Sequence, residues 1–257
     1  MSPSRLLLLL ACASPLAAAL VEKPVEYKSG DVTCEGWQAY DDAAGKRPAV
    51  LVVHQWTGIS AHEKEAARKL AELGYNVLVA DVYGKGVRPQ PPAAGQEAGK
   101  YKKDRTLLRA RLTAALDVLK ADPRTDGAKL AATGYCFGGT SVLELARSGA
   151  DLKGVVSFHG GLDSPTPADG KNIKGKVLAL HGADDPYVPA KDVAAFEQEL
   201  KAAKVDYKLV KYPGAVHSFT HKEAGTDSSK GAAYNEAADK ASWAEMKAFL
   251  AGLFGQK

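Results

Sequence analysis

The chain has 257 residues, 46% of them hydrophobic and 25% charged, which is ordinary for a soluble globular protein. This length suffices for one large α/β domain with its own core and is too short for two such domains. The 34 basic and 30 acidic residues give a formal charge of +4 without a basic block, so nucleic-acid binding is not indicated.

The N-terminal residues have the pattern of a secretory signal peptide. Arg5 precedes the short apolar run Leu6–Ala13, and a small-residue exit ends at Ala19. We predict cleavage after about Ala19, which makes residues 1–19 the signal and residues 20–257 one mature domain, exported to the periplasm or secreted. A membrane anchor is the alternative, but the apolar run falls short of the about 20 residues that a bilayer requires. No later segment is apolar enough to span a membrane.

The three cysteines raise two further alternatives. A lipoprotein anchored at Cys12 would change the localisation, although the bulky Leu10 fits that signal poorly. Cys34 and Cys136 remain after export and could pair in an oxidising compartment. We expect Cys34 to be a small apolar strand residue and Cys136 to stay free.

The mature chain begins with a predicted hairpin and continues with alternating strands and helices. Val25–Tyr27 and Val32–Tyr40 have the pattern of an antiparallel strand pair that turns at Gly30. The continuous apolar run Ala49–Val53 predicts a buried central strand. Ser60–Leu73 carries apolar residues at helical spacing and predicts a helix.

The rest of the chain repeats this alternation. Val77–Ala80 predicts a strand, Tyr83–Gly99 a loop rich in proline, glycine and lysine, and Lys100–Ala121 one long amphipathic helix. The later predicted elements are strand Leu130–Tyr135, helix Phe137–Ala146, strands Val155–Phe158 and Val177–Leu180, helix Ala190–Ala203, strand Asp206–Tyr212 and helix Ala233–Leu253.

This order predicts an α/β fold with a mainly parallel central sheet and helices on both faces, because parallel neighbours need crossover connections. In such sheets the chemistry gathers at the carboxyl ends of the strands. The side chains to inspect are therefore those directly after each strand: His54-Gln55-Trp56, Asp81-Val82-Tyr83, Cys136, His159, His181 to Asp185, and His217.

The sharpest motif is Gly134-Tyr135-Cys136-Phe137-Gly138-Gly139, which follows a predicted strand and opens a helix. This is the setting of a nucleophile elbow, with cysteine where serine is usual. The central residue occupies a sharp, strained turn, and the strand and helix approach so closely that the flanking positions must be glycine. The helix N-terminus favours a thiolate. The alternative is a structural cysteine in a glycine-rich turn.

An elbow nucleophile requires an acid and then a histidine on later loops. Asp184 and Asp185 follow the strand Val177–Leu180, and Asp185 is preferred because it lies just before a Pro-x-Val turn. His217 follows the next strand and would be the base. Each residue alone could be a turn former or a surface side chain, but their order in the chain favours a Cys136–His217–Asp185 triad.

The oxyanion hole is predicted from backbone N–H groups. One belongs to Phe137, directly after the nucleophile, and the other to Trp56, after the strand Ala49–Val53. Trp56, Tyr83 and Phe137 are candidates for an apolar acyl pocket, although plain packing is the commoner role of such aromatics. The segments Gly84–Gly99 and Lys222–Tyr234 are expected to frame the substrate.

These residues resemble the dienelactone hydrolase family, over nearly the whole mature chain. The resemblance rests on His54-Gln55-Trp56-Thr57-Gly58, Ala80-Asp81-Val82-Tyr83-Gly84, the elbow motif, Asp185-Pro186-Tyr187-Val188-Pro189 and His217-Ser218-Phe219. It implies a single domain of the α/β-hydrolase fold, a Cys-His-Asp triad, no metal and no organic cofactor.

Three positions in the substrate pocket depart from the family pattern. Gln55 stands where the best-known members carry a glutamate that helps to switch on the thiol, and glutamine cannot ionise. Lys85 and His221 stand where those members bind the substrate's carboxylate with two arginines. Lysine lacks the bidentate fork, and histidine is only partly charged near neutral pH. We therefore expect a substrate other than dienelactone itself.

The sequence thus predicts an exported, monomeric hydrolase that cleaves a small-molecule ester or lactone through a covalent acyl-enzyme. A thioesterase or peptidase could use the same triad, since the triad does not choose the leaving group. A binding protein that has kept the fold and lost the reaction is a further alternative. A metal hydrolase is disfavoured because histidines such as His54 and His181 show no tight ligand spacing.

Overall fold

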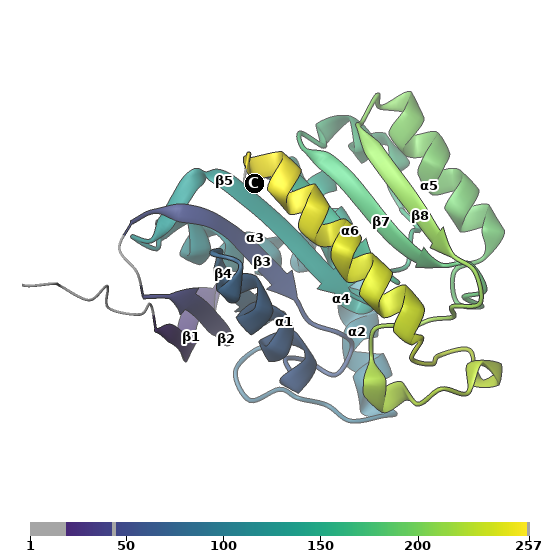
Figure 1. Cartoon of the computed structure of the whole chain (residues 1–257), viewed down its shortest axis with the longest axis horizontal. Helices are drawn as coiled ribbons and strands as arrows, with labels where there is room; N and C mark the ends of the chain where they lie inside the picture. Colours follow the sequence, from purple (N-terminus) through teal and green to yellow (C-terminus); the bar gives the residue numbers. More distant parts are fainter. Residues whose placement is uncertain (1–18, 43–44, 256–257) are drawn as a thin grey trace, which may run out of the picture.

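The computed structural model describes residues 19–42 and 45–255, so the predicted signal peptide lies outside the described residues except for Ala19. An eight-stranded sheet forms the centre, in the order β1-β2-β4-β3-β5-β6-β7-β8 (Figure 1). The strands are β1 Leu20–Ser29, β2 Val32–Asp41, β3 Arg47–Val53, β4 Asn76–Ala80, β5 Thr125–Tyr135, β6 Gly154–Phe158, β7 Lys176–Gly182 and β8 Tyr207–Tyr212. The helices are α1 Ala61–Glu72, α2 Ala93–Lys103, α3 Arg105–Ala121, α4 Phe137–Arg147, α5 Ala190–Ala202 and α6 Glu236–Phe254, with short 3-10 turns η1 Pro167–Asn172, η2 Lys222–Ala224 and η3 Ser228–Lys230.

The strand directions confirm the predicted α/β class. β1 and β2 form the expected antiparallel hairpin, and β2 also runs antiparallel to β4. All other neighbours, from β4 through β3 and β5 to β8, are parallel. The carboxyl ends of β3 to β8 therefore meet at one edge of the sheet, where the residues that follow them can approach one another.

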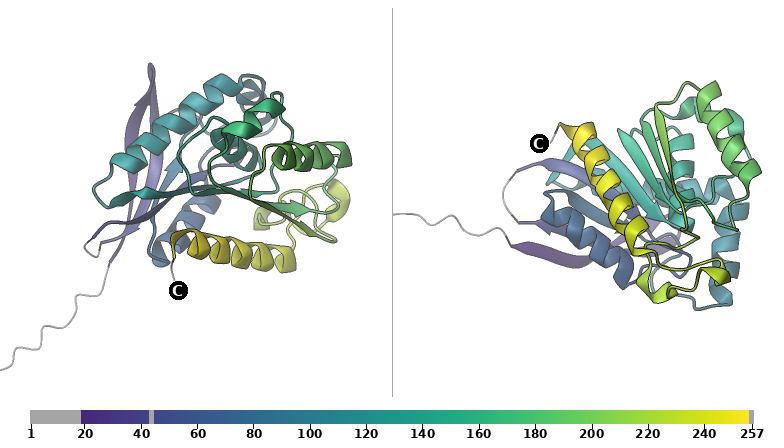
Figure 2. Two further views of the ribbon diagram at one scale, coloured as in Figure 1. Left: turned by 90° about the horizontal axis from the view of Figure 1, so that it is seen from above. Right: turned by 45° about the vertical axis from the view of Figure 1, so that its right-hand side comes forward.

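Helices cover both faces of the sheet, as predicted. α1 and α6 lie on one face, and α3, α4 and α5 lie on the other (Figure 2). Alternate residues of β3 serve the two cores: Leu51 and Val53 belong to the core under α3 and α4, whereas Val50 and Val52 belong to the core under α1 and α6. None of the helices in the described part of the chain is long and apolar enough to cross a bilayer.

The predicted loop Tyr83–Gly99 and the predicted single helix Lys100–Ala121 are both wrong in detail. A helix, α2, already begins at Ala93, directly after the prolines that favoured a loop. It ends at Asp104, whose side chain accepts a hydrogen bond from the N–H of Leu107 and so caps a second helix, α3. The amphipathic pattern runs on across this break, which is why the sequence suggested one helix.

The loop after β3 is fixed by the first turn of α1. Ser60 and Glu63 form a capping box, in which each side chain binds the backbone N–H of the other. The Glu63 carboxylate is fully buried and also accepts from the N–H of Gln55 at 3.2 Å. The cap of the helix thereby sets the path of Gln55 and Trp56 past the end of β3.

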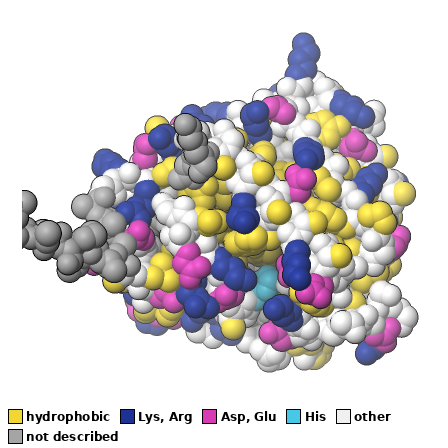
Figure 3. Space-filling model, viewed as in Figure 1, with side chains coloured by type: hydrophobic (Ala, Val, Ile, Leu, Met, Phe, Trp, Pro, Cys, Tyr) yellow, Lys and Arg dark blue, Asp and Glu magenta, His cyan; other side chains and the backbone are white. Residues whose placement is uncertain are grey.

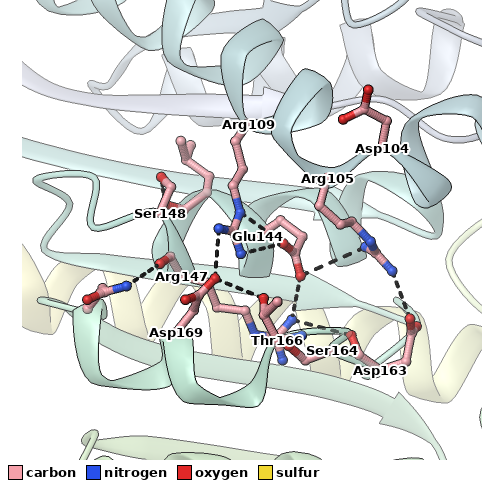
Figure 4. A network of polar contacts seen from close by, with 12 residues as sticks. Asp104, Arg105, Arg109, Glu144, Arg147, Ser148, Asp163, Ser164, Thr166 and Asp169 are labelled. Carbon is pink, nitrogen blue, oxygen red and sulfur yellow. Dashed lines mark hydrogen bonds and ion pairs between the residues drawn. The ribbon is translucent and has the colours of Figure 1, made fainter.

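A buried ionic network on the sheet face covered by α3, α4 and α5 holds the segment after β6 (Figure 4). The Glu144 carboxylate, on α4, is fully buried and lies within ion-pair distance of Arg105, Arg109 and Arg147. Arg105 also pairs with Asp163, and Arg109 with Asp169 in η1. The network joins α3, α4 and the segment after β6, so one carboxylate stabilises the contact of three chain segments.

Candidate active site

The motif at the end of β5 forms the predicted elbow. Cys136 has φ 55° and ψ −114°, a strained conformation for a residue with a Cβ atom. A Cβ on Gly134 would lie 2.2 Å from the carbonyl oxygen of Gly138, and one on Gly138 would lie 2.1 Å from the carbonyl oxygen of Val53. The glycines therefore allow β3, β5 and α4 to approach within backbone contact and raise the cysteine side chain at the sheet edge.

The structure brings Cys136, His217 and Asp185 together in one chain of hydrogen bonds. His217 Nε2 lies 3.0 Å from Cys136 Sγ, and His217 Nδ1 lies 2.8 Å from Asp185 Oδ2. The other oxygen of Asp185 accepts from the N–H of Tyr187 at 2.8 Å. The carboxylate is thus oriented by the backbone and in turn holds the imidazole toward the sulfur.

The charges in this chain favour a thiolate paired with an imidazolium. Burial disfavours the thiolate, but the nearby His217 and its hydrogen bond outweigh burial, so the pKa of the Cys136 thiol is lowered. Burial alone would lower the pKa of His217, but the Cys136 sulfur and the Asp185 carboxylate raise it well above the usual value of histidine. Such a pair presents a nucleophile without needing a separate base to form it.

Asp184, the alternative acid, lies elsewhere. Its side chain is exposed and accepts from the N–H of Gly214 at 2.9 Å, which supports the turn before His217. The segment Lys222–Tyr234 approaches His217 directly, because the N–H of His217 donates to the carbonyl of Gly231 at 3.2 Å. The two neighbouring acids therefore have separate positions, and only Asp185 contacts the imidazole.

A buried histidine that the sequence did not single out as functional supports the elbow from behind. His159 Nδ1 accepts from the N–H of Cys136 at 3.1 Å, so in the neutral ring Nε2 donates to Thr220 Oγ1 at 2.8 Å. Burial and the neighbouring His217 hold the pKa of His159 well below its usual value. Cys136, His159 and Ser218 are three of the four described non-glycine residues with positive φ, so strained backbone concentrates here.

The two predicted oxyanion donors come from the start of α4 and from the turn after β3. Phe137 is the first residue of α4, and its backbone hydrogen bond to Cys136 contributes to the lowered thiol pKa. Trp56 lies in the turn after β3, with its indole 37% exposed. The backbone N–H of Trp56 makes no hydrogen bond to a described residue, while the backbone carbonyl of Trp56 accepts from the Tyr83 hydroxyl at 2.9 Å.

Tyr83 and Phe137 belong to a packed aromatic cluster. Both are buried, with ring centroids 5.7 Å apart, and the buried His54 ring lies 4.7 Å from that of Tyr83. His54 Nε2 accepts from the N–H of Val82 at 3.2 Å, which leaves Nδ1 as the donor to the carbonyl of Gln55. Both ring nitrogens of His54 are therefore used in hydrogen bonds that connect the ends of β3 and β4.

Of the predicted pocket residues, Gln55 and His221 contact each other, whereas Lys85 pairs with other residues. Gln55 Nε2 lies 3.3 Å from His221 Nδ1, so the glutamine contacts the histidine. The ammonium of Lys85 instead pairs with Glu26 and Glu35 on the outer hairpin. These ion pairs place the Lys85 ammonium beside carboxylates on β1 and β2, and its role in the substrate pocket stays a prediction.

Cys34 is fully buried in the core on β2, and both described cysteines are free thiols. Among the described residues, no group of three or more histidine, cysteine, aspartate or glutamate side chains is arranged to bind a metal ion.

Comparison with known proteins gives a consistent family. The model of the dienelactone hydrolase family matches residues 35–254. A dienelactone hydrolase-like promiscuous phosphotriesterase from metagenomic libraries is similar in structure, with a TM-score of 0.87, 39% identity, and coverage of 92% of this chain and 99% of that one. A proposed dienelactone hydrolase from Klebsiella pneumoniae has a TM-score of 0.78, 26% identity and coverage of 91% and 99%. A proposed carboxymethylenebutenolidase of Synechocystis is 27% identical over 226 residues, 82% of this chain and 89% of that protein.

Proposed function

The chain belongs to the dienelactone hydrolase family, and from that premise we propose that it cleaves a small ester or lactone with Cys136 as nucleophile, His217 as base and Asp185 as orienting acid. The observation that carries the proposal is the continuous contact from Sγ through the imidazole to the carboxylate, at 3.0 and 2.8 Å. Membership of the family indicates that an ester or lactone bond is cleaved, and the geometry supports these three side chains as the groups that cleave it.

The first half of the reaction forms an acyl-enzyme. The Cys136 thiolate attacks the carbonyl carbon, a C–S bond forms, and the negative charge moves to the carbonyl oxygen. The N–H groups of Phe137 and Trp56 would stabilise that oxyanion. When the C–O bond to the leaving group breaks, the His217 imidazolium gives its proton to the departing oxygen, and a thioester remains.

The second half hydrolyses the thioester. Neutral His217 takes a proton from water, whose oxygen attacks the same carbonyl carbon. The C–S bond then breaks, the carboxylic acid leaves, and the thiolate–imidazolium pair returns. Asp185 keeps the Nδ1–H of the imidazole toward itself throughout, so that Nε2 stays on the side of the sulfur and the substrate.

The test is hydrolysis of p-nitrophenyl acetate by the purified protein. We expect the rate to fall by about three orders of magnitude or more in Cys136→Ala and in His217→Ala. Cys34→Ala, at the other described cysteine, is the matched control and should retain activity, since Cys34 is buried in the core. Equal rates in the wild type and both site variants would reject the assignment.

We further propose that uncharged substrates are preferred over carboxylate-bearing ones. Lys85 is already paired with Glu26 and Glu35, and His221 contacts Gln55, so neither is a free cation for an anionic substrate. A neutral lactone should therefore have a higher kcat/KM than the same lactone bearing a carboxylate. A preference for the carboxylate-bearing lactone would contradict this.

A second candidate reaction is phosphotriester hydrolysis. It is favoured by the 39% identical metagenomic phosphotriesterase, whose structure superposes over 92% of this chain. The same thiolate would attack phosphorus in place of carbon, so that an S–P bond forms, the P–O bond to the leaving phenol breaks and the His217 imidazolium gives it a proton. Water activated by neutral His217 would then attack phosphorus and break the S–P bond, with the phosphoryl oxygen at the position of the oxyanion. The test is release of p-nitrophenol from diethyl p-nitrophenyl phosphate, with a thioester and a peptide ester in parallel to compare leaving groups.

Export is proposed from the N-terminal sequence alone. A cleaved signal predicts that the protein occurs outside the cytoplasm and that its N-terminal residue is Leu20. Cell fractionation with N-terminal sequencing tests both points, and a lipid-modified N-terminus at Cys12 would favour the lipoprotein alternative. The predicted monomeric state is tested by size-exclusion chromatography with light scattering.

A further inference from the structure

A cavity of about 390 Å³ lies between α1 and α6, apart from the thiol. Figure 3 looks onto this face and shows basic and acidic side chains gathered around a histidine between the two helices. The inner wall is formed by Tyr135, Phe158 and Thr220, which are all buried, and the outer wall includes Trp243. The volume exceeds that of an apolar cavity of about 150 Å³ that accommodates benzene, so a substituted ring fits.

The cavity is distinct from the proposed catalytic site. The hydroxyl of Thr220, on its wall, accepts from His159 Nε2 at 2.8 Å, and the other ring nitrogen of His159 accepts from the N–H of Cys136. His159 is fully buried between the two, so the imidazole and the inner wall separate the cavity from the sulfur. Neither Cys136 nor His217 lines the cavity.

The walls carry polar groups that the chain leaves unsatisfied. The side chain of Tyr135 is only 2% exposed, and its hydroxyl makes no hydrogen bond to any described residue. The adjacent His62, whose ring packs edge-on against Tyr135 at 4.7 Å, has its Nε2 buried without a partner. Leaving the buried His62 Nε2 unpaired is costly unless something binds it.

A carboxylate acceptor is also part of the cavity lining. Asp239 lines the same cavity, and its charge acts together with burial to raise the pKa of the Tyr135 phenol. The hydroxyl of Tyr234 donates to Asp239 Oδ2 at 3.2 Å, while Oδ1 has no hydrogen-bond partner within residues 19–42 and 45–255. A bound hydroxyl group could accept from Tyr135 and donate to Asp239, which satisfies both.

The remaining lining sets the chemical class. The rings of Tyr135 and Phe158 stack at 4.7 Å, and Trp243 also lines the cavity, so the walls offer aromatic surface to a flat ring. The lining carries the carboxylates of Glu65, Glu223 and Asp239 and the ammonium groups of Lys69 and Lys222. A lining with three carboxylates and two ammonium groups does not favour an anion, so a ligand without negative charge fits best.

We propose that this cavity is a second binding site, which takes an uncharged hydroxylated aromatic compound of the phenol class. The ring lies against Phe158 and Trp243, and the hydroxyl bridges Tyr135 and Asp239. The site is independent of ester cleavage, because the thiol does not contribute to it.

The experiment measures binding of phenol, fluorobenzene and benzoate to the full chain carrying Cys136→Ala, which excludes turnover, by calorimetry. Tyr135→Phe removes only a hydroxyl without a partner, so the variant should fold. We expect it to weaken phenol binding at least tenfold and to leave fluorobenzene binding unchanged. Ala61→Trp, at an exposed residue of the cavity lining, should weaken both ligands, and Glu72→Trp, on the same helix outside the lining, should weaken neither.

Two results would overturn the proposal. One is phenol binding that is absent at millimolar concentration or indifferent to both Tyr135→Phe and Ala61→Trp. The other is benzoate binding more tightly than phenol, which would show that charge and not the hydroxyl is recognised. Neither result bears on the ester assay, which uses the intact thiol.

Discussion

Replacing Gly138 with alanine tests the close approach of helix and strand on which the elbow depends. The new Cβ would lie 2.1 Å from the carbonyl oxygen of Val53, 2.7 Å from its carbon and 2.8 Å from the carbonyl oxygen of His54. Ordinary van der Waals contact begins at 3.4 Å, so α4 and β3 would have to separate by about 1 Å. All three atoms are backbone atoms at the end of the central strand β3 and directly after it, and they cannot rotate away.

The cost follows from that displacement. Overpacking against movable side chains costs about 1–3 kcal/mol, and an immovable backbone puts this variant at about 3 kcal/mol or more. For a domain of this size, about 1 kcal/mol corresponds to a shift of roughly 2–4 °C in Tm. We therefore expect Gly138→Ala to lower Tm by about 6–12 °C, together with slower alkylation of Cys136 as the elbow moves.

The assay is thermal unfolding followed by circular dichroism, with Gly252→Ala as the matched control. Gly252 lies exposed near the end of α6, and a Cβ there would meet nothing within 4 Å. Alanine favours a helix over glycine by about 0.5–1 kcal/mol, so the control should melt slightly higher than wild type. A Gly138→Ala protein that melts within a degree of wild type would refute the close-packing argument.

Three further outcomes follow from the site and the ionic network. Asp185→Asn should lower kcat for p-nitrophenyl acetate by up to about four orders of magnitude, whereas Asp184→Asn should stay within a few-fold of wild type; comparable losses in both would contradict the geometry. Because the thiolate predominates above the thiol pKa, and His217 lowers the pKa of Cys136, iodoacetamide should label Cys136 at lower pH in wild type than in His217→Ala; superimposable pH profiles measured by mass spectrometry would argue against the ion pair. Glu144→Gln removes the buried carboxylate that three arginines share, although each keeps a second one (Asp163, Asp169 or Glu199), and should cost about 1–3 kcal/mol in urea unfolding; an unchanged midpoint would show that water screens the network.

The fold was predictable because its signals are local. Most of the parallel strands contain a short apolar run, and Ser60 and Glu63 at capping-box spacing mark the start of helix α1. The failure at α2 and α3 has the opposite cause. Pro89, Pro91 and Pro92 suggested a loop, yet they only precede the helix, and Asp104 interrupts an apolar stripe whose period does not change.

The site was predictable only where the order of residues along the chain carries the information. The cysteine, the acid and the histidine follow the parallel strands β5, β7 and β8, so their meeting at one edge follows from topology. The direction of Lys85 depends on Glu26 and Glu35, which lie far away in sequence, and no local pattern reports it. The same holds for His159, whose partners are a backbone N–H and a threonine hydroxyl.

The separation of 81 residues between Cys136 and His217 has a consequence for the nascent chain. Until the last strand and the loop beyond it have docked, the sulfur has no imidazole beside it. It then behaves as a common cysteine, mostly protonated near neutral pH and slow toward electrophiles. Chemical reactivity is therefore acquired only at the end of folding, and the newly made polypeptide is protected against premature modification of its own nucleophile.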